Sequence, residues 1–574
     1  MSTWPGPRGG WRAKPKVPLR LPSPLRVRAG LLAILAWIAP PAPAQDPATL
    51  AAIPSLAALE AAGAVIGEIR INAQDIFDLD DPKENNWLFR AANWLHIRTR
   101  PETLRHQLLF RSGERLSVRV IEETERLLRG NSFLYEAAIR PIAWRNGVAD
   151  LEVRTRDSWS LQFGASVSYA GGTTSGGTNL SDDNLFGTGM RFSIASSSSS
   201  AVSTAGGTRR GVDISFSYPF AFDGHTSIGY SQSHFNEGSG SSVAVNRPFY
   251  ALDSRWAAGA SSTKDNRLVD SYAGGAIAAQ YRRHQERADG TLGWSQGLVR
   301  GWVHRVSAGL RYEHTAYQAE PGRAAPAQLP ADRTLVAPYL SYQVVQDEFR
   351  EVRNLNQIGR PEYLLLGWQS SLVFGRASTG LGSTQTVSQY SGSLSKGAHI
   401  GAEGTLLSSA SLSGERSEGR SDRQVLSAAT RYYKRRADRT LYYLSLTGDA
   451  TNFSDATRYL SLGGDTGLRG YPANYQLGAR RVLFTAERRF YTDWYPFRLI
   501  RVGGAVFYDI GRAWSGPYEK PSGNDWSSDV GFGLRLLSAR SSSGTTLHVD
   551  FAFPLEREPG VKSFQFSFKS RSGF

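Results

Sequence analysis

Most of this chain consists of short segments in which apolar and polar residues alternate, separated by clusters of Gly, Ser, Asn and Asp. From residue 158 to residue 574 such segments follow one another, and helix signals are scarce. In the last segment, Phe564, Phe566 and Phe568 alternate with polar residues. This alternation predicts strands with one apolar face. Such strands form either a soluble sandwich, which buries that face, or a membrane barrel, which turns it to lipid.

The hydropathy of the chain favours the barrel over a helical membrane protein. No apolar run reaches the length of about 20 residues that a transmembrane helix needs. Only helices and closed barrels satisfy their backbone hydrogen bonds in lipid, so a membrane location requires a barrel. The mean hydropathy of -0.34 and the 59 glycines fit that architecture. Because the chain has no cysteine, disulfides, thiolate metal sites and cysteine nucleophiles are excluded.

The first 44 residues are typical of a signal peptide. They hold seven basic residues and no acidic one, then the apolar run AGLLAILAWIA and a small-residue cleavage pattern at residues 42–44. The formal net charge of +15 therefore falls to 15 − 7 = +8 for the remainder. Since the remaining basic residues are scattered, we expect no nucleic-acid partner. Lumen arginines and contacts with anionic lipopolysaccharide account for the charge.

A small α+β domain is predicted ahead of the alternating segments. We expect a strand near residues 68–71, a helix opening at Pro101, a second helix over 117–129, and strands over 133–140 and 148–154. The turn Asn146-Gly147 is a strong hairpin signal between those strands. The predicted organisation is a signal peptide (1–44), a linker (45–63), the α+β domain (64–156) and an antiparallel transmembrane β-barrel of about 16 strands (157–574). Five of these strands follow Gly478.

Three features follow one another between residues 460 and 513. A loop contains Arg469-Gly470-Tyr471, the next strand contains Glu487, and the strand after it contains Asp509. Alternation places Glu487 and Asp509 on the polar, inward faces of their strands. This order resembles the signature of the BamA/TamA superfamily of outer-membrane assembly and translocation barrels, the bacterial surface antigen type. The resemblance implies that the loop folds into the lumen, where Arg469 meets Glu487 and Asp509.

Other parts of the chain support the resemblance. The strand-helix-helix-strand-strand order resembles a polypeptide-transport-associated (POTRA) domain, and the stretches 93–100, 122–129 and 184–189 resemble family-typical ones. We expect 184–189 at the first hairpin of the barrel. Phe574 is in phase with Phe564, Phe566 and Phe568, which resembles the C-terminal assembly signal of outer-membrane barrels. The family's essential insertase carries several POTRA domains, whereas this chain has room for one.

The resemblance implies a protein of the bacterial outer membrane, with its N-terminal domain in the periplasm, that inserts or translocates polypeptides. Its partners would be client outer-membrane or secreted polypeptides, outer-membrane lipid and lipopolysaccharide, and accessory periplasmic or lipoprotein partners. A client would pair with a strand edge of the POTRA-like domain, and the barrel would open between its first and last strands, near residues 158–169 and 563–568. We expect no cofactor and no metal.

Two other classes of function remain open at this point. One is a dedicated secretion pore for a single partner protein, or a lipid-handling relative; a passive channel is compatible with either. The other is an outer-membrane enzyme, for which Ser-x-x-Lys occurs at Ser261–Lys264 and at Ser393–Lys396. Neither occurrence lies at a predicted helix start, and no Gly-x-Ser-x-Gly elbow is present. We therefore expect no catalytic activity.

Overall fold

The computed structural model describes residues 53–574 with short gaps. The residues outside the description are 1–52, 171–172, 202–207, 274–275, 360, 418–419, 438, 453–459, 473–474, 516–525, 542–545, 557–560 and 572–574. The expected signal peptide, most of the expected linker and Phe574 lie outside the described residues. Among the helices that are described, none is long and apolar enough to cross a membrane.

The N-terminal region forms a three-stranded sheet covered by helices. Its strands pair in the order β1-β3-β2, with β1 parallel to β3 and β3 antiparallel to β2. Its helices and strands are α1 (Leu56–Ala61), β1 (Val65–Gln74), α2 (Trp87–Leu95), α3 (Pro101–Arg105), α4 (Val118–Arg129), β2 (Leu134–Arg145) and β3 (Val148–Asp157). Asn146 and Gly147, with φ of 51° and 81°, form the tight turn between β2 and β3, as the sequence predicts.

Helices α1 and α2 are additions to the predicted order. Helix α1 lies in the stretch expected as a linker, and Ser55 caps its N-terminus by accepting from the Ala58 N–H. Helix α2 begins after Asn86, whose side chain accepts from the Phe89 N–H at 3.0 Å. Helix α4 places Ile121 and Leu128 in the core under the sheet, so its apolar face is the predicted one.

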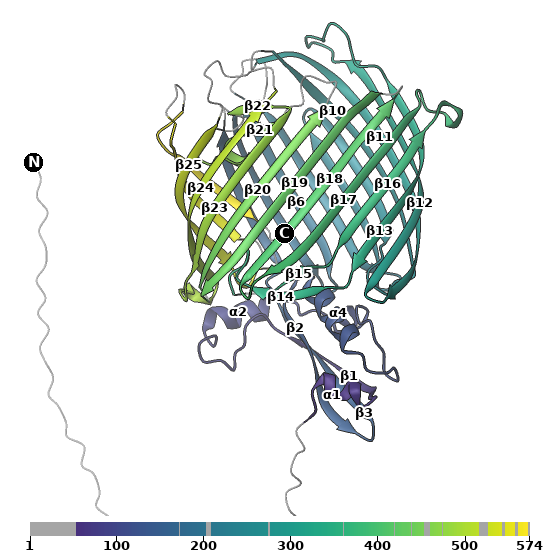
Figure 1. Ribbon diagram of the computed structural model, residues 1–574, viewed down its shortest axis with the longest axis vertical. Helices are drawn as coiled ribbons and strands as arrows, with labels where there is room; N and C mark the ends of the chain where they lie inside the picture. The colour runs from purple at the N-terminus through teal and green to yellow at the C-terminus, as the bar shows by residue number, and fades with distance from the viewer. Residues whose placement is uncertain are drawn as a thin grey trace, which may run out of the picture. The chain divides into compact units, whose positions relative to one another are not determined.

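Residues from Leu161 onward form one antiparallel barrel, which confirms the predicted fold class (Figure 1). Its described strands are β4 (Leu161–Ala170), β5 (Thr173–Leu185), β6 (Met190–Ala201), β7 (Arg209–Ala221), β8 (Thr226–Phe235), β9 (Gly238–Arg247), β10 (Trp256–Ala273), β11 (Ala276–Val299), β12 (Trp302–Ala319), β13 (Arg333–Gln346), β16 (Gln369–Ala377), β17 (Val387–Ile400), β18 (Gly404–Ser417), β19 (Arg420–Ala437), β20 (Thr440–Asn452), β23 (Arg480–Tyr491), β24 (Ile500–Trp514), β25 (Ser527–Ser538), β26 (Thr546–Pro554) and β27 (Gln565–Arg571). Strand β27 neighbours β4 and closes the ring.

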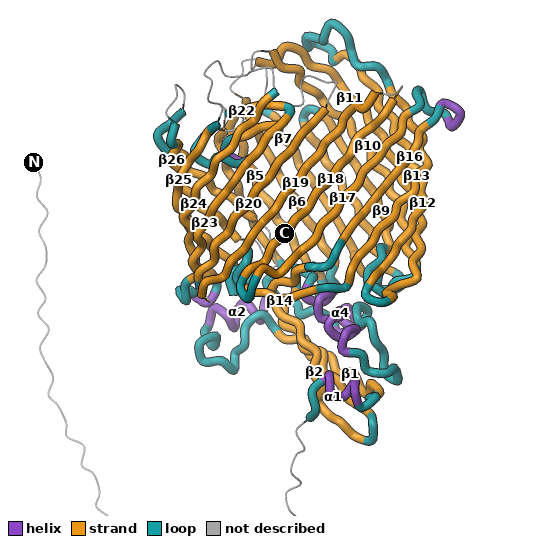
Figure 2. The backbone as a smooth tube through the Cα atoms, in the orientation of Figure 1, coloured by secondary structure: helices purple, strands orange, loops and turns teal. Residues whose placement is uncertain are grey.

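Smaller elements lie in the connections between these strands. They are the hairpin β14 (Phe349–Arg353) and β15 (Pro361–Leu365), the short pair β21 (Leu460–Leu462) and β22 (Gln476–Gly478), and the 3-10 turns η1 (Thr379–Leu381), η2 (Gly464–Thr466) and η3 (Pro496–Arg498). Helices α2 and α4 lie next to one end of the barrel, which we call the domain-side end, and α1 lies farther from the barrel on the same side (Figure 2). The pair β21–β22 lies at the opposite, far end (Figure 1).

The barrel has twenty described strands rather than about 16. The five strands expected after Gly478 are present as β23 to β27, so the shortfall lies earlier in the chain. Strand β6 contains five consecutive serines, and β9 reads GSGSSVAVNR. Small polar residues on both faces leave little contrast between alternate positions, so alternation alone underestimates the number of such strands. Residues 276–297, which could hold one strand or a hairpin, belong to the single strand β11.

The two faces of the barrel wall carry different side chains. Outward positions hold large apolar residues such as Leu340, Leu372 and Phe374, which are 64%, 59% and 56% exposed. Inward positions hold polar or charged residues, many of them buried, such as Thr315 and Ser445. This is the arrangement of a barrel whose outer face meets lipid and whose lumen is polar.

Candidate functional site

The loop between β20 and β23 starts at the far end of the barrel and turns back into the lumen. Its base is held by the antiparallel pair β21–β22, and η2 follows immediately after β21. The side chain of Gln476 ties the base to the wall, because its Oε1 accepts from the Ala513 N–H at 2.7 Å and its Nε2 donates to Ser527 Oγ at 2.9 Å. Leu462, Leu468 and Tyr471 form a buried apolar contact behind the loop.

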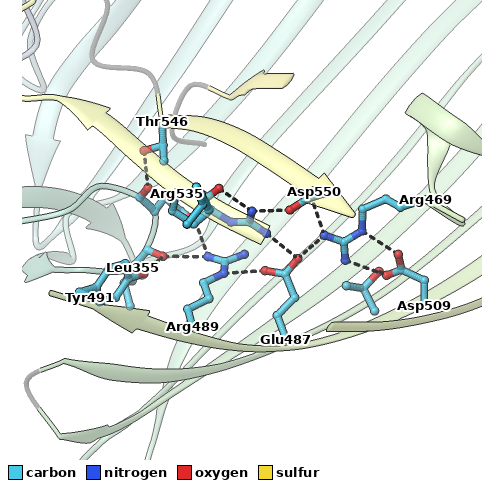
Figure 3. A network of polar contacts seen from close by, with 12 residues as sticks. Leu355, Arg469, Glu487, Arg489, Tyr491, Asp509, Arg535, Thr546 and Asp550 are labelled. Carbon is cyan, nitrogen blue, oxygen red and sulfur yellow. Dashed lines mark hydrogen bonds and ion pairs between the residues drawn. The ribbon is translucent and has the colours of Figure 1, made fainter. Parts of the chain in front are cut away.

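Arg469 of this loop lies between two carboxylates of the barrel wall (Figure 3). Its Nε and Nη2 donate to the two oxygens of Asp509 in β24, at 2.7 and 3.0 Å. Its Nη1 donates to Glu487 in β23 at 2.9 Å. The side chains of Arg469, Glu487 and Asp509 are only 5%, 1% and 1% exposed. The structure therefore brings together the three residues that the sequence singled out, with a bidentate contact to Asp509.

The two residues after Arg469 fix the loop against the next strands of the wall. The Gly470 N–H donates to Asp529 Oδ2 at 3.0 Å, and a Cβ at this position would lie 2.7 Å from the Asp529 Cβ and 2.9 Å from the Pro554 nitrogen. Only glycine allows so close an approach without a shift of the wall. The Tyr471 hydroxyl donates to the Ser528 carbonyl at 3.0 Å and contacts the carboxylate of Glu556.

Three further charged residues complete what we call the lumen cluster. The cluster consists of Arg469, Glu487, Arg489, Asp509, Arg535 and Asp550 (Figure 3). Arg489 Nε donates to Glu487 Oε2 at 2.7 Å, Asp550 accepts from Arg469 Nη1 at 3.3 Å, and Arg535 contacts Asp550. In the sequence, these three residues occupy polar positions that alternate with apolar ones along their strands. Alternation could not show that side chains from β23, β25 and β26 meet, because that depends on the curvature of the wall.

The lumen cluster balances its charge. Three guanidinium groups face three carboxylates, and the Arg469 guanidinium carbon also lies 3.4 Å from the centre of the Phe507 ring. Burying such a set gains little net stability, because desolvation offsets much of the attraction. Removal of one member is different, since it leaves its partners charged and buried. The cluster therefore acts chiefly as a specific lock on the position of the loop.

A cavity of about 510 Å³ lies beside the loop within the lumen. Arg469 and Glu487 line it on one side, and Ser409, Arg431 and Ser445 line it from strands β18 to β20. Its walls are mostly small or polar, so it is suited to water or an extended polar chain rather than to an apolar ligand. No group of three or more His, Cys, Asp or Glu residues placed to hold a metal ion occurs among the described residues.

The N-terminal domain joins the barrel through two of the stretches that carry the family resemblance. Asp157, which is fully buried, accepts from the Thr99 N–H at 2.7 Å, from Thr99 Oγ1 at 2.9 Å and from His96 Nε2 at 2.8 Å. Asn184 Nδ2 donates to Thr99 Oγ1 at 2.9 Å, and the Arg100 N–H donates to the Gly187 carbonyl at 2.8 Å. Residues 184–189 thus form the β5–β6 turn at the domain-side end, not the first hairpin of the barrel as expected.

Helix α4 makes a second contact between the domain and the barrel. The carboxylate of Glu123 accepts from the Leu252 N–H at 2.7 Å and from Arg119 Nη1 at 3.0 Å. Arg119 also pairs with Asp253 in the same barrel connection. Burial raises the pKa of Glu123 against the opposing effect of these donors.

The phenylalanines near the end of the chain lie on the outer face. Phe564, Phe566 and Phe568 are 51%, 55% and 63% exposed. Phe566 packs against Phe551 of β26, with ring centres 5.1 Å apart. Their proposed role as an assembly signal remains a prediction, and Phe574 is not among the described residues.

Comparisons with known proteins identify the family of the chain. The Omp85 superfamily domain model matches residues 184–570, which is more than half of the chain. The comparison with curated proteins returns no match. Among solved structures, CdiB from Escherichia coli is 14% identical, with 88% of this chain and 76% of that chain covered and a TM-score of 0.46. CdiB from Acinetobacter baumannii is also 14% identical, with 88% and 74% covered and a TM-score of 0.44.

A third solved structure is BamA from Haemophilus ducreyi lacking POTRA domains 1–3. It is 14% identical, with 88% of this chain and 85% of that chain covered and a TM-score of 0.37. The assignment rests on the family model, whose match runs from the β5–β6 turn to the last strand of the barrel and includes the whole lumen cluster. The chain is an outer-membrane β-barrel protein of the Omp85 superfamily.

Proposed function

We propose that this protein inserts or translocates polypeptides at the outer membrane. In this proposal residues 64–156 are a POTRA-like domain in the periplasm and residues 157–574 are the barrel. The observation that carries it is the loop locked inside an Omp85 barrel by the contacts of Arg469 with Glu487 and Asp509. Because the lumen cluster holds one part of the barrel wall rigid, two strands in another part of the wall can separate without collapse of the barrel.

Client capture uses an open edge of the N-terminal sheet. Residues 113–116 cover the first half of β1, where the Gly113 N–H donates to the Ile66 carbonyl and the Leu116 N–H donates to the Ala64 carbonyl. Beyond that point, Ile69–Gln74 pairs with β3 on one side and with no other described strand. An extended client segment can add there by backbone hydrogen bonds, which do not depend on its sequence.

Release into the membrane uses the seam between β4 and β27. As far as the structure describes it, β27 is the shortest strand of the barrel, and its pairing with β26 covers Gln565–Arg571. Strand β5, which follows β4, is rich in Thr, Ser and Gly. A short strand is the place where the least pairing has to be broken for the barrel to open.

Quantitative proteomics of the outer membrane and the culture medium, with and without the protein, tests this proposal. Cells that carry Arg469→Ala are compared with cells that carry Arg480→Ala, an exposed arginine outside the lumen cluster. We expect loss of one or more surface or secreted proteins in the deletion and in Arg469→Ala only. Loss of several unrelated barrels means general assembly, and loss of one means a dedicated translocator. Unchanged protein profiles in the deletion strain would refute polypeptide handling.

A further inference from the structure

The connection between β13 and β16 differs from the other described turns at the domain-side end. Turns such as 300–301 and 401–403 are short, whereas residues 347–368 form the hairpin β14–β15. The two strands pair from Phe349–Leu365 to Arg353–Pro361. The alternation of apolar and polar residues does not predict this hairpin, and the proposed function does not use it.

The tip of the hairpin contacts the wall far from the strands that carry it. The Leu355 carbonyl accepts from Arg489 Nη1 at 2.9 Å and from the Tyr491 hydroxyl at 3.3 Å, both in β23. The Asn356 carbonyl accepts from Thr546 Oγ1 of β26 at 3.1 Å. In the ring of twenty described strands, β26 is the eighth from β16, counted through β17, β18, β19, β20, β23, β24 and β25. The hairpin therefore crosses the mouth of the barrel close to its full width.

The tip has an internal structure of its own. The Glu362 carboxylate accepts from the N–H groups of Leu355, Asn356 and Gln357, at 2.9, 3.1 and 3.2 Å. This carboxylate holds three successive amides in one turn, in the manner of an anion nest. Leu355 and Ile358 are buried against the inner wall, in an apolar contact that includes Tyr433, Leu441 and Leu537. A tip that is preorganised and buried in this way is a docked element rather than a surface loop.

The base of the hairpin contacts the N-terminal domain. The Arg126 guanidinium of α4 lies 4.2 Å from the centre of the Phe349 ring, and that of Arg129 lies 5.4 Å from the centre of the Tyr363 ring. Arg129 Nη1 also lies 3.5 Å from Glu351. The hairpin thus touches α4 at its base. At its tip, Leu355 contacts Arg489 (Figure 3). Arg489 in turn shares Glu487 with Arg469 of the loop.

We propose that the β14–β15 hairpin is a plug that closes the domain-side mouth of the lumen and links α4 to the lumen cluster. Barrels of 16 to 18 strands leave an aqueous channel, and larger ones hold a plugged lumen, so a barrel of this size needs such an element to stay ion-tight. The loop with Arg469 fills the lumen from the far end, and the hairpin fills it from the domain-side end. The two meet at Glu487. Closure of the pore does not depend on the proposed function, whereas displacement of the plug by a client does.

Ion conductance of the full-length protein in planar lipid bilayers tests the plug. Glu362→Ala removes the acceptor that organises the tip, and Glu348→Ala is the control, because Glu348 is an exposed carboxylate at the base of the same hairpin that pairs only with Lys396 among the described residues. We expect the open probability to rise severalfold in Glu362→Ala and to stay at the wild-type level in Glu348→Ala. If Glu362→Ala does not fold, Asn354→Ala replaces it, since Asn354 Oδ1 accepts from the Gly359 N–H within the tip at 2.6 Å.

A reversible tether distinguishes the plug from a general loosening of the barrel. The chain contains no cysteine, so Asn356→Cys with Thr546→Cys introduces the only pair that can be oxidised. In the Glu362→Ala background, oxidation should lower the conductance to the wild-type level, and reduction should raise it again. Oxidation should not change the conductance of either single-cysteine variant. Wild-type conductance in Glu362→Ala and Asn354→Ala would overturn the proposal that the hairpin closes the lumen. A raised conductance that oxidation of the cysteine pair does not lower would also overturn it. Export of clients by the oxidised double-cysteine variant is measured in a separate experiment. A failure of the proposed function would therefore not affect the interpretation of the conductance.

Discussion

Arg469 and Asp509 face each other through two parallel hydrogen bonds of 2.7 and 3.0 Å, although forty residues separate them in the chain. One residue lies in a loop and the other lies in the wall of the barrel, so this contact fixes how far the loop enters the lumen. Both side chains are almost fully buried. The planar fork of arginine suits this position, because lysine can offer only a point charge.

Substitution of Arg469 tests the lock. We expect Arg469→Ala to destabilise the barrel by about 3–5 kcal/mol, the typical effect of removing one partner from a buried ion pair. Arg469→Lys should recover only part of that loss. The measurement is the temperature at which the folded band disappears on semi-native gels. Arg480→Ala, at an exposed position, is the control. A midpoint for Arg469→Ala equal to that of the control would show that the cluster does not hold the barrel.

The shared carboxylate of Glu487 should couple two arginines. Arg469 binds one oxygen of Glu487 and Arg489 binds the other, at 2.9 and 2.7 Å. The changes in unfolding free energy of Arg469→Lys and Arg489→Lys should therefore depart from additivity by about 0.5–3 kcal/mol. Arg480 serves as the comparison partner, because it is exposed and lies outside the lumen cluster. If the effects of Arg469→Lys and Arg489→Lys were additive, as expected for Arg469→Lys with the comparison substitution, the loop and the hairpin would not be energetically coupled through Glu487.

The outward row of the last strand should be sensitive to charge. Phe566 is 55% exposed on the outer face, whereas the neighbouring Gln565 lies on the inward face. We expect Phe566→Lys to lower the amount of assembled protein in the outer membrane, because a lysine on the lipid face costs about 2–4 kcal/mol near the bilayer midplane. Gln565→Lys should assemble normally. Equal amounts of the two variants would argue against an outward role for this row.

The contact of α4 with the barrel should weaken as the pH rises. Burial raises the pKa of Glu123 above that of the unfolded chain, whose reference value is 4.5. Between those two pKa values the folded protein binds more protons than the unfolded chain, so its stability falls as the pH rises through this window. Amide exchange of α4 in the full-length protein, corrected for intrinsic rates, should show a smaller pH dependence in Glu123→Gln than in the wild type. The same slope in both proteins would contradict this prediction.

Alternation was sufficient for the parts of the fold where opposite faces differ strongly. The five strands from β23 to β27 were predicted because large apolar residues such as Phe551 alternate with charged ones such as Asp550. Where consecutive serines remove the contrast between alternate positions, as in β6, alternation undercounts the strands. The hairpin β14–β15 was missed because its strands are five residues long and Pro361 opens the second.

The site was predictable as a set of inward residues but not as a network. The inward positions of Glu487 and Asp509 followed from the period of two residues along a strand. That Asp550 would reach Arg469, 81 residues away, depends on barrel curvature and on the depth of the loop, which alternation does not encode. Gly533 illustrates this point, because a Cβ there would lie 2.0 Å from the Asp550 carboxylate.

Crosslinking in living cells tests the central claim, passage of a polypeptide at the seam, most directly. A photoreactive amino acid is placed at Phe163 in β4, or at Phe374 in β16, which is ten strands away in the ring of twenty. Both side chains are exposed, at 76% and 56%. We expect adducts with newly exported polypeptides from Phe163 and none from Phe374. An absence of adducts at Phe163, or equal adducts at both positions, would contradict this claim.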